Sequence, residues 1–385
     1  MSCGAPFSCT AAHSVSRVGD LPEISLSVPA GSIGTSSIGG GTMRGKWRAW
    51  SWWMRGVVVG LALVAVVSVP VAGILTALLV YNVGEQSEQA RSRGKDAFWL
   101  GHAWVDGRRT DADIDGLAKL LAGTGIRDLY VHTGPLEHDG SLRDDLAPRA
   151  RWFVDAVHTK LPGIRVQSWL GDIVQPEFDG LDVESAASRE WVVTSARRVL
   201  DYGFDGVHYD LEPIRSGSPG YLALLEQTRV MTAAAGVTLS VSAPVIDPLP
   251  GLHAVGIAVA DHGKWWSQAY FAEVARRVDQ VAVMSYDTAM PTRALYSGYV
   301  AQQTELALEV TPAEVDLLMG APAFWADDPG HHGAAETVAA AVRGIRLGQT
   351  RTDVGRANFG VALYVDFAAT PQDWADYRQG WCVTA

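Results

Sequence analysis

The sequence predicts an α/β protein, a (β/α)8 TIM barrel preceded by one transmembrane helix. Two observations support this prediction. Over residues 96–385, apolar runs of strand length alternate with amphipathic stretches of helical length, which is typical of repeated βα units around a parallel sheet. Ahead of them, residues 56–81 form one long apolar segment. We therefore divide the chain into a tail (1–55), an apolar helix (56–81), a charged linker (82–95) and the barrel (96–385).

The tail has two parts of different composition. Residues 1 to about 40 are rich in Ser, Gly, Ala and Thr without periodicity, which indicates disorder. A basic, Trp-rich segment follows, with Arg44, Lys46, Trp47, Arg48, Trp50, Trp52, Trp53 and Arg55. Tryptophans gather at membrane interfaces, and basic residues stay on the cytoplasmic side. We expect residues 1–55 in the cytoplasm and the barrel outside the cell membrane.

The apolar segment is long enough to span a bilayer. Gly56 to Val80 contains about 25 residues without a charge, and a hydrocarbon core is about 30 Å thick. Pro70 is tolerated in a membrane span. A cleaved signal peptide is the alternative, but its apolar core is typically about 7–15 residues long. We therefore expect an uncleaved, single-pass signal anchor. Met43 opens a segment that would itself form a compact signal anchor, so Met1 and Met43 both stay open as starts.

The barrel follows as eight strand and helix pairs. The strands are expected at 98–105, 126–134, 164–171, 204–213, 238–244, 280–287, 315–324 and 357–365, and the helices at 112–123, 145–160, 185–202, 219–236, 265–278, 296–310, 334–348 and 371–381. Eight such pairs close a barrel. An open doubly wound sheet is the alternative, but no Gly-rich phosphate loop follows the first strand.

Charge and cysteine content exclude several classes of protein. The formal net charge is −11, and no basic stripe follows residue 110, so nucleic acid is not an expected partner. The three cysteines, Cys3, Cys9 and Cys382, lie near the chain ends without CxxC spacing. Neither a disulfide framework nor a structural zinc site is indicated.

Polar chemistry concentrates on the fourth predicted strand. His208, Asp210 and Glu212 stand at positions i, i+2 and i+4, so they share one face of the strand. Active sites of such barrels lie at the C-terminal ends of the strands, which is where Glu212 falls. The alternative is a buried hydrogen-bonded network without a catalytic role, because buried charges require partners.

This strand resembles the DxxDxDxE signature of glycoside hydrolase family 18, the chitinase-like barrels. Asp205, Asp210 and Glu212 match three of its four acidic positions, and His208 stands where an Asp is usual. The form is similar to the DGVNxDxE variant of spore-cortex and cell-wall N-acetylglucosaminidases, which has Asn there. A hydrogen-bond donor at this position is thus compatible with activity by resemblance.

Two other segments support the resemblance, which covers about 280 residues. The run from Met284 to Asp287 resembles the family's MxYD motif on strand six, and the run from Gly320 to Phe324 resembles GxPxY on strand seven. Tyr364 on strand eight departs from the pattern, because the family commonly has a Trp floor there.

The resemblance implies substrate-assisted, retaining hydrolysis without a metal or cofactor. Glu212 would be the general acid and then the base, and its neighbour Asp210 would raise its pKa. Asp210 would also bind the acetamide N–H, while Tyr286 would hold the acetamide oxygen. Asp287 would bind the sugar ring or the attacking water. Supporting roles fall to Asp205, His208, Met284 and Asp287.

Several residues beyond these motifs are secondary candidates. Trp99, Trp169, Trp325 and Tyr364 are expected to stack on sugars, although rim packing is the alternative for each tryptophan. Asp327 and Asp328 are interpreted as a solvated loop. His331 and His332 are interpreted as surface residues, since no partner stands at metal-ligand spacing.

Two other functions stay open. A two-carboxylate barrel glycosidase needs a second carboxyl group about 5–5.5 Å away for retention, but strand seven ends in Ala-Pro-Ala-Phe-Trp without a Glu. A non-catalytic chitinase-like sugar-binding protein usually lacks the acid, whereas Glu212 is present. An outward-facing, membrane-held barrel favours N-acetylglucosamine-containing polymers near its own cell, such as peptidoglycan, ahead of chitin. Endo and exo cleavage are equally compatible with the sequence.

Overall fold

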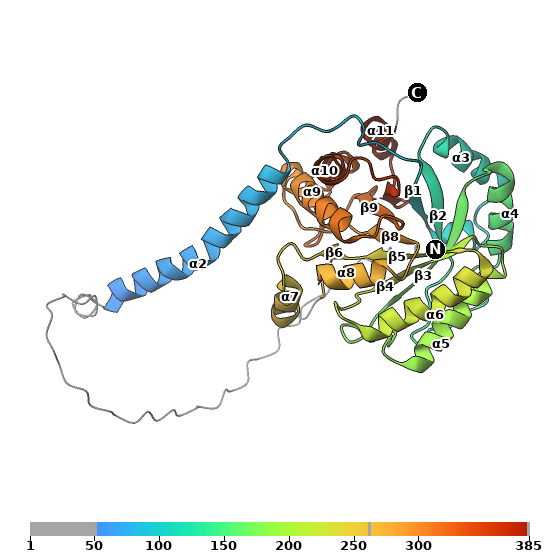
Figure 1. Cartoon of the computed structure of the whole chain (residues 1–385), viewed down its shortest axis with the longest axis horizontal. Coiled ribbons are helices and arrows are strands. Elements are labelled where there is room, and N and C mark those ends of the chain that lie inside the picture. The colour runs from blue at the N-terminus through green and yellow to red at the C-terminus, as the bar shows by residue number, and fades with distance from the viewer. Residues whose placement is uncertain (1–51, 261–262, 383–385) are drawn as a thin grey trace. The chain divides into compact units, whose positions relative to one another are not determined.

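The computed structural model describes residues 52–260 and 263–382. The chain divides into two compact units, Met1–Ala65 and Val66–Ala385. The second unit contains a closed barrel of parallel strands in the order β1-β10-β9-β8-β5-β4-β3-β2, and helices surround these strands (Figure 1). The predicted TIM barrel is thus confirmed. The predicted disordered tail lies outside the described residues up to Ser51.

Strands and helices alternate as the sequence predicts, within a few residues at most ends. The barrel strands are β1 (Asp96–Leu100), β2 (Ile126–His132), β3 (Arg165–Ile173), β4 (Gly206–Glu212), β5 (Thr238–Ala243), β8 (Gln280–Val283), β9 (Asp316–Pro322) and β10 (Phe359–Tyr364). The outer helices are α3 (Asp111–Leu121), α4 (Ala150–Lys160), α5 (Ala186–Leu200), α6 (Pro219–Ala235), α8 (Gln268–Ala275), α9 (Arg293–Val310), α10 (Val338–Thr352) and α11 (Pro371–Gly380). The strands are apolar on both faces because helices cover them outside and side chains fill the barrel inside.

Local signals fix where the helices begin and end. The Ser218 side chain accepts the backbone N–H of Tyr221 at the start of α6, Pro219 stands at the first turn, and Gly236 ends the helix with φ 68°. Thr370 and Asp373 form a capping box at the start of α11. Such caps satisfy backbone groups that a helix end leaves unpaired.

The lower part of the barrel interior is a satisfied polar network. Asp128 is fully buried, and Arg165 holds its two oxygens through Nε and Nη2, each at 2.7 Å. Gln167 and Gln280 donate to the same carboxylate at 2.9 and 3.0 Å. Tyr130 donates to the Gln280 side chain at 2.7 Å. This network closes the barrel floor with its charges paired.

An insertion between β5 and α8 is the main element that the sequence did not predict. It consists of β6 (Val245–Ile246), α7 (Leu252–Ala260) and β7 (Trp265–Trp266), and the two short strands pair in parallel. Segments of two residues have no measurable periodicity, so their pattern is indistinguishable from a loop. The insertion leaves the C-terminal end of β5, which is the side of the barrel mouth.

The apolar N-terminal helix is present as α2 (Trp52–Tyr81), which begins four residues before the predicted start. It is long and apolar enough to cross a membrane, with a mean hydropathy of 2.7 and none of its most apolar window buried. Leu78, near its end, is buried in a cluster with Val245, Leu295 and Tyr299.

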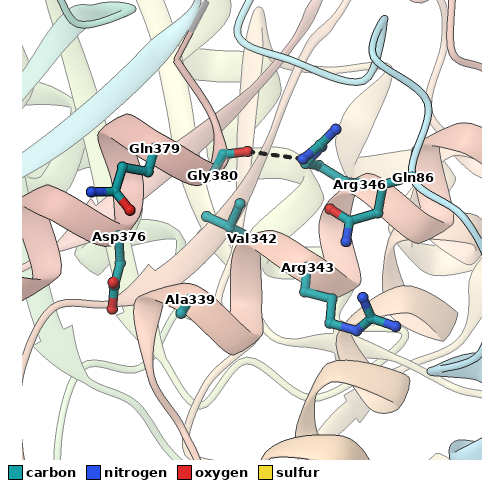
Figure 2. A pocket seen from close by; sticks show the side chains of 8 residues that line it. All are labelled: Gln86, Ala339, Val342, Arg343, Arg346, Asp376, Gln379 and Gly380. Atoms are coloured by element: carbon teal, nitrogen blue, oxygen red, sulfur yellow. Dashed lines mark hydrogen bonds between the residues drawn. The ribbon is translucent and has the colours of Figure 1, made fainter.

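The segment that follows α2, residues 82–90, is bound to the barrel by hydrogen bonds. Arg343 on α10 donates to the side chain and the backbone carbonyl of Asn82 at 3.0 and 2.8 Å. Arg346 donates to the carbonyls of Ser87 and Ala90 at 3.0 and 2.9 Å. Figure 2 shows both arginines beside Gln86 in a pocket of about 310 Å³ between this segment, α10 and α11.

Candidate active site

Asp210 and Glu212 stand two positions apart on β4, so their side chains share one face of the strand at the mouth of the barrel. Gly171 on β3 pairs with Asp210, and Ile173 pairs with Glu212. A side chain at Gly171 would meet the Asp210 backbone carbonyl oxygen at 3.0 Å, so glycine lets the two strands approach closely here. Trp169 Nε1 donates to Asp210 Oδ2 at 2.9 Å. The other oxygen, Oδ1, is buried without a hydrogen-bond partner.

The two carboxyl groups titrate differently. Burial raises the pKa of Asp210. The pKa of Glu212 lies well above its ordinary value, first because protein atoms crowd the carboxyl group, and then because of the charges of Asp210 and Asp287. As a residue Glu212 is still exposed at the strand end, so its proton can reach a ligand. The negative charge of Asp210 beside Glu212 therefore favours the protonated form of Glu212.

His208 lies one pleat below, fully buried and stacked on Tyr130 with ring centroids 3.8 Å apart. Burial lowers the pKa of His208 to about 3, so the ring is neutral at neutral pH. Trp99 Nε1 donates to its Nε2 at 3.2 Å, which puts the proton on Nδ1, facing Ser240 Oγ at 2.7 Å. Ser242 Oγ lies 3.0 Å from the same Nε2.

These contacts explain the departure from the acidic pattern. Where the resembling pattern has an Asp, the neutral His208 has its polar contacts with Trp99, Ser240 and Ser242. The hydroxyl group of Ser242 also lowers the pKa of Asp210 against the effect of burial. A serine therefore links the two levels of the site.

Tyr286 reaches the mouth from the loop after β8. Its ring stacks on Tyr364 with centroids 5.4 Å apart and an interplanar angle of 21°. A Cβ atom at Gly320 would lie 2.8 Å from the Tyr286 ring, so the first glycine of the strand-seven motif makes space for it. Burial raises the pKa of Tyr286 far above its ordinary value, so its hydroxyl group remains a hydrogen-bond donor.

Asp287 is held in an unusual backbone conformation beside Tyr286. Its φ is 56° and that of Ala289 is 55°, a left-handed region that non-glycine residues rarely adopt. Glu336 accepts the Thr288 N–H at 3.2 and 3.1 Å through its two oxygens, and Gly330 accepts that of Ala289 at 2.8 Å. The loop after β9 thus fixes the loop that carries Asp287.

The interpretation of His331 as a surface residue was wrong. His331 is buried, whereas His332 is partly exposed. His331 Nδ1 lies 2.8 Å from Asp287 Oδ1 and 3.6 Å from Glu336 Oε2. The doubled histidine gave no sequence signal because its partner Asp287 stands 44 positions earlier. Glu336 was missed for the same reason.

Asp287, His331 and Glu336 bring their ligand atoms within 4.8 Å of one another, as in some metal sites. Their contacts favour an ion-pair cluster instead. Lys264 Nζ donates to the Asp287 carbonyl at 3.2 Å and interacts with the charges of both carboxylates. A nearby ammonium group opposes a second cation at the same place.

The remaining motif residues lie away from this centre. Asp205 is at the lower end of β4, where its Oδ2 accepts the Val166 N–H at 2.8 Å and lies 2.7 Å from His158 Nε2. It joins β3 to β4 and is not brought together with Glu212. Met284 continues the sheet through its backbone N–H, which donates to the Ala243 carbonyl at 2.8 Å.

The aromatic candidates divide by exposure. Trp99 is 1% exposed and belongs to the barrel interior, so its ring offers no face to a sugar in this structure. Trp169 is buried as well, although its indole N–H reaches Asp210. Tyr364 is half-buried at the mouth. Trp325 is 69% exposed, and Phe367, which the sequence did not single out, is 56% exposed.

The fold is similar to that of several solved structures. The spore cortex-lytic enzyme SleL of Bacillus cereus is 14% identical, with a TM-score of 0.53 over 78% of this chain and 77% of that chain. A chitinase of Chromobacterium violaceum ATCC 12472 is 15% identical, with a TM-score of 0.52 over 74% of this chain and 98% of that chain. A class V chitinase of Pseudomonas fluorescens Pf-5 is 12% identical, with a TM-score of 0.51 over 74% and 98%.

No protein-family model matches the sequence, and no match is found among curated proteins. The resemblance to chitinase-like barrels that the sequence predicts is confirmed by these neighbours at the level of the fold. At such low identity the activity must be argued from the site itself.

Proposed function

We propose that the barrel is a glycoside hydrolase that cleaves β-linked glycans containing N-acetylglucosamine by substrate-assisted, retaining catalysis. The observation that supports this most strongly is the pair at the end of β4. Glu212 is an exposed acid with a raised pKa, and Asp210 beside it has one buried oxygen without a donor. An acetamide N–H of the substrate would supply that donor.

In the first step, the Glu212 proton passes to the glycosidic oxygen as the bond from C1 to that oxygen breaks. The acetamide carbonyl oxygen attacks C1 from the opposite face and forms a cyclic oxazolinium ion. Asp210 Oδ1 accepts the acetamide N–H and stabilises the positive charge. The Tyr286 hydroxyl group donates to the acetamide oxygen and orients it for attack.

In the second step, the Glu212 carboxylate takes a proton from water, and the water oxygen attacks C1 from the side that the leaving group vacated. The oxazolinium ring opens, the acetamide is restored, and Glu212 is protonated again. Two inversions give a product with the original β configuration. Asp287 lies within electrostatic reach of Glu212 and would position the water or the sugar ring.

The test is turnover of N-acetylchitooligosaccharides and muropeptide glycans by the full chain in detergent or nanodiscs, compared with Glu212→Gln. We expect the variant to lose at least about 10³-fold in kcat, since the acid acts in both steps. Asp327→Asn, a carboxylate exposed at the rim, is the matched control and should retain full activity. Equal sugar binding without turnover by either protein would overturn the enzyme and leave a sugar-binding protein.

We also propose that α2 anchors the barrel to the cell membrane, with the barrel on the extracytoplasmic side. The support is a 30-residue apolar helix preceded by Arg44, Lys46 and Arg48 in the sequence. Extraction with sodium carbonate should leave the full chain in the membrane fraction, and protease added outside spheroplasts should digest the barrel. Release of the chain by carbonate would contradict anchoring, and a protected barrel would contradict the orientation.

A further inference from the structure

The insertion helix α7 is apolar apart from His253, and its residues 252–258 are partly or fully exposed. The run from Pro248 to Ala260 contains no Asp, Glu, Lys or Arg. None of the residues whose burial is described on the helix, 252–258, is buried. Val255 is 55% exposed, and Leu249, just before the helix, is 61% exposed. A helix that is apolar all round is normally found in a core or in a membrane.

The two short strands that flank this helix, β6 and β7, form its base. These strands pair with each other in parallel. The Gln303 side chain on α9 accepts the Ile246 N–H at 2.7 Å and donates to the Ile246 carbonyl at 2.9 Å. His253 on the helix lies 2.5 Å from the buried Asp247 carboxylate. The base therefore holds the helix in place with its apolar surface outward.

The base of α7 also contacts the end of α2. Leu78 packs with Val245 of β6 and with Leu295 and Tyr299 of α9, and Trp265 of β7 packs against this cluster. The approach is close, because a Cβ atom at Gly298 would lie 1.9 Å from the Leu78 carbonyl oxygen. The base of α7 thus lies beside the point where the apolar helix meets the barrel.

The segment directly after α2, residues 82–87, is bound to the barrel along its length. The first residue after α2, Asn82, is bound by Arg343 through two hydrogen bonds. Val83 accepts from Arg351 at 2.5 Å, and the Ser87 N–H donates to Thr350 at 2.9 Å. A barrel attached so closely cannot move away from a bilayer that α2 spans. The apolar surface of α7, which lies near the end of α2, must then contact either the lipid or the water at the membrane surface.

We propose that α7 docks into the lipid interface of the membrane that α2 spans, as a second membrane contact beside the anchor. This inference rests on the proposed anchoring by α2. A nine-residue helix offers little of the roughly 800 Å² per partner that a standard protein interface buries. Binding to a lipid interface needs no such fixed area, because its strength scales with the apolar area that is buried.

Docking through α7 also orients the catalytic mouth. The insertion leaves the mouth end of β5, and its Lys264 donates to the backbone of Asp287 in the active-site loop. The rim around Asp287 would therefore lie close to the bilayer, and the substrates that reach it most easily would be glycan strands at the membrane surface.

The test measures lipid contact by fluorescence quenching. The full chain, with its native cysteines replaced, carries an environment-sensitive dye at Val255→Cys and is placed in nanodiscs whose acyl chains are brominated. Val66→Cys, on the part of α2 in the same unit as the barrel and 69% exposed, reports the anchor. Val230→Cys on α6, 74% exposed, is the matched control for an exposed valine elsewhere on the barrel.

We expect brominated lipid to quench the dyes at positions 66 and 255 at least about twofold and to leave the dye at position 230 unchanged. Adding Leu249→Asp and Ile257→Asp should restore the emission at position 255 only. Quenching at position 66 but not at 255 would overturn docking by α7 and leave the anchor intact. An absence of quenching at both positions would overturn the anchor as well.

Discussion

The lower and upper levels of the barrel interior both bury carboxylates, but they treat them differently. At the lower level Asp128 has donors on both oxygens from Arg165, Gln167 and Gln280. At the upper level Asp210 has an oxygen without a donor, and no cation lies between it and Glu212 among the contacts of the described residues. The first arrangement stabilises the barrel floor. The second leaves a carboxylate oxygen to which a ligand can donate a hydrogen bond.

This difference distinguishes a structural acid from the acids that we propose to be functional on the same sheet. A buried carboxylate that is fully paired contributes to folding, and its loss costs free energy of unfolding. A buried carboxylate left partly unpaired destabilises the apo protein but is ready to bind. Variants that remove a group from one level at a time test this difference.

After the loss expected for Glu212→Gln, the largest effect on activity is that of Asp210→Asn. The change removes the anion that stabilises the oxazolinium ion, so kcat should fall by roughly 10²-fold or more. It also removes a charge that raises the pKa of Glu212. Since Glu212 must be protonated to act, activity declines as pH rises through that pKa, and the alkaline limb of kcat/KM should move to lower pH. An unmoved limb would contradict the coupling between the two acids.

The next effect is that of Asp128→Asn on stability. The variant removes the carboxylate that Arg165 binds through two hydrogen bonds and leaves Asp316, 3.7 Å away, as its counter-charge. The free energy of unfolding should fall by about 3 kcal/mol. Thermal unfolding measures this, and activity per folded molecule should stay within twofold. Asp115→Asn, which removes a surface ion pair with Lys160, is the control and should cost less than about 1 kcal/mol. Equal losses in both variants would remove the distinction between the levels.

A smaller effect is expected at His331, which positions Asp287 without touching substrate. His331→Phe fills the same space but loses the contact with Asp287, and kcat should fall by about tenfold, the effect of losing one positioned hydrogen bond. His331→Asn keeps a donor and should recover most of that loss. The exposed His332→Ala is the control. A Phe variant with wild-type kcat would show that Asp287 is held by its backbone alone.

A further effect concerns the pH dependence of stability. His208 has a folded pKa of about 3 against about 6.5 when unfolded, so between these values the unfolded chain binds the extra proton. The neutral ring favours folding fully above pH 6.5, and this contribution decreases as pH falls toward 3. His208→Asn should make the free energy of unfolding less sensitive to acid in this window. An unchanged slope would show that His208 titrates normally.

Much of this architecture could be predicted from local sequence patterns. The alternation of strand and helix lengths predicted all eight barrel pairs, and the period-two spacing of His208, Asp210 and Glu212 placed them along one wall. These features depend on residues close in sequence, where periodicity and position are directly readable.

What the sequence did not predict depends on long-range contacts. The contact of His331 and Glu336 with Asp287 joins two loops from different strands. The binding of Asn82 by Arg343 uses a backbone carbonyl, which has no sequence signature. The helix α7 has no clear signal in the sequence, because its apolar run is too short to show a period and does not face a core.

The central claim is that the substrate's own acetamide acts as the nucleophile over Glu212 and Asp210. It is tested most directly by comparing kcat/KM for aryl glycosides that carry N-acetyl, N-fluoroacetyl and N-trifluoroacetyl groups. Fluorine withdraws electron density from the carbonyl oxygen, so the account predicts a steep fall in rate with each fluorine added. Equal rates across the series would contradict substrate assistance and require a nucleophile from the protein.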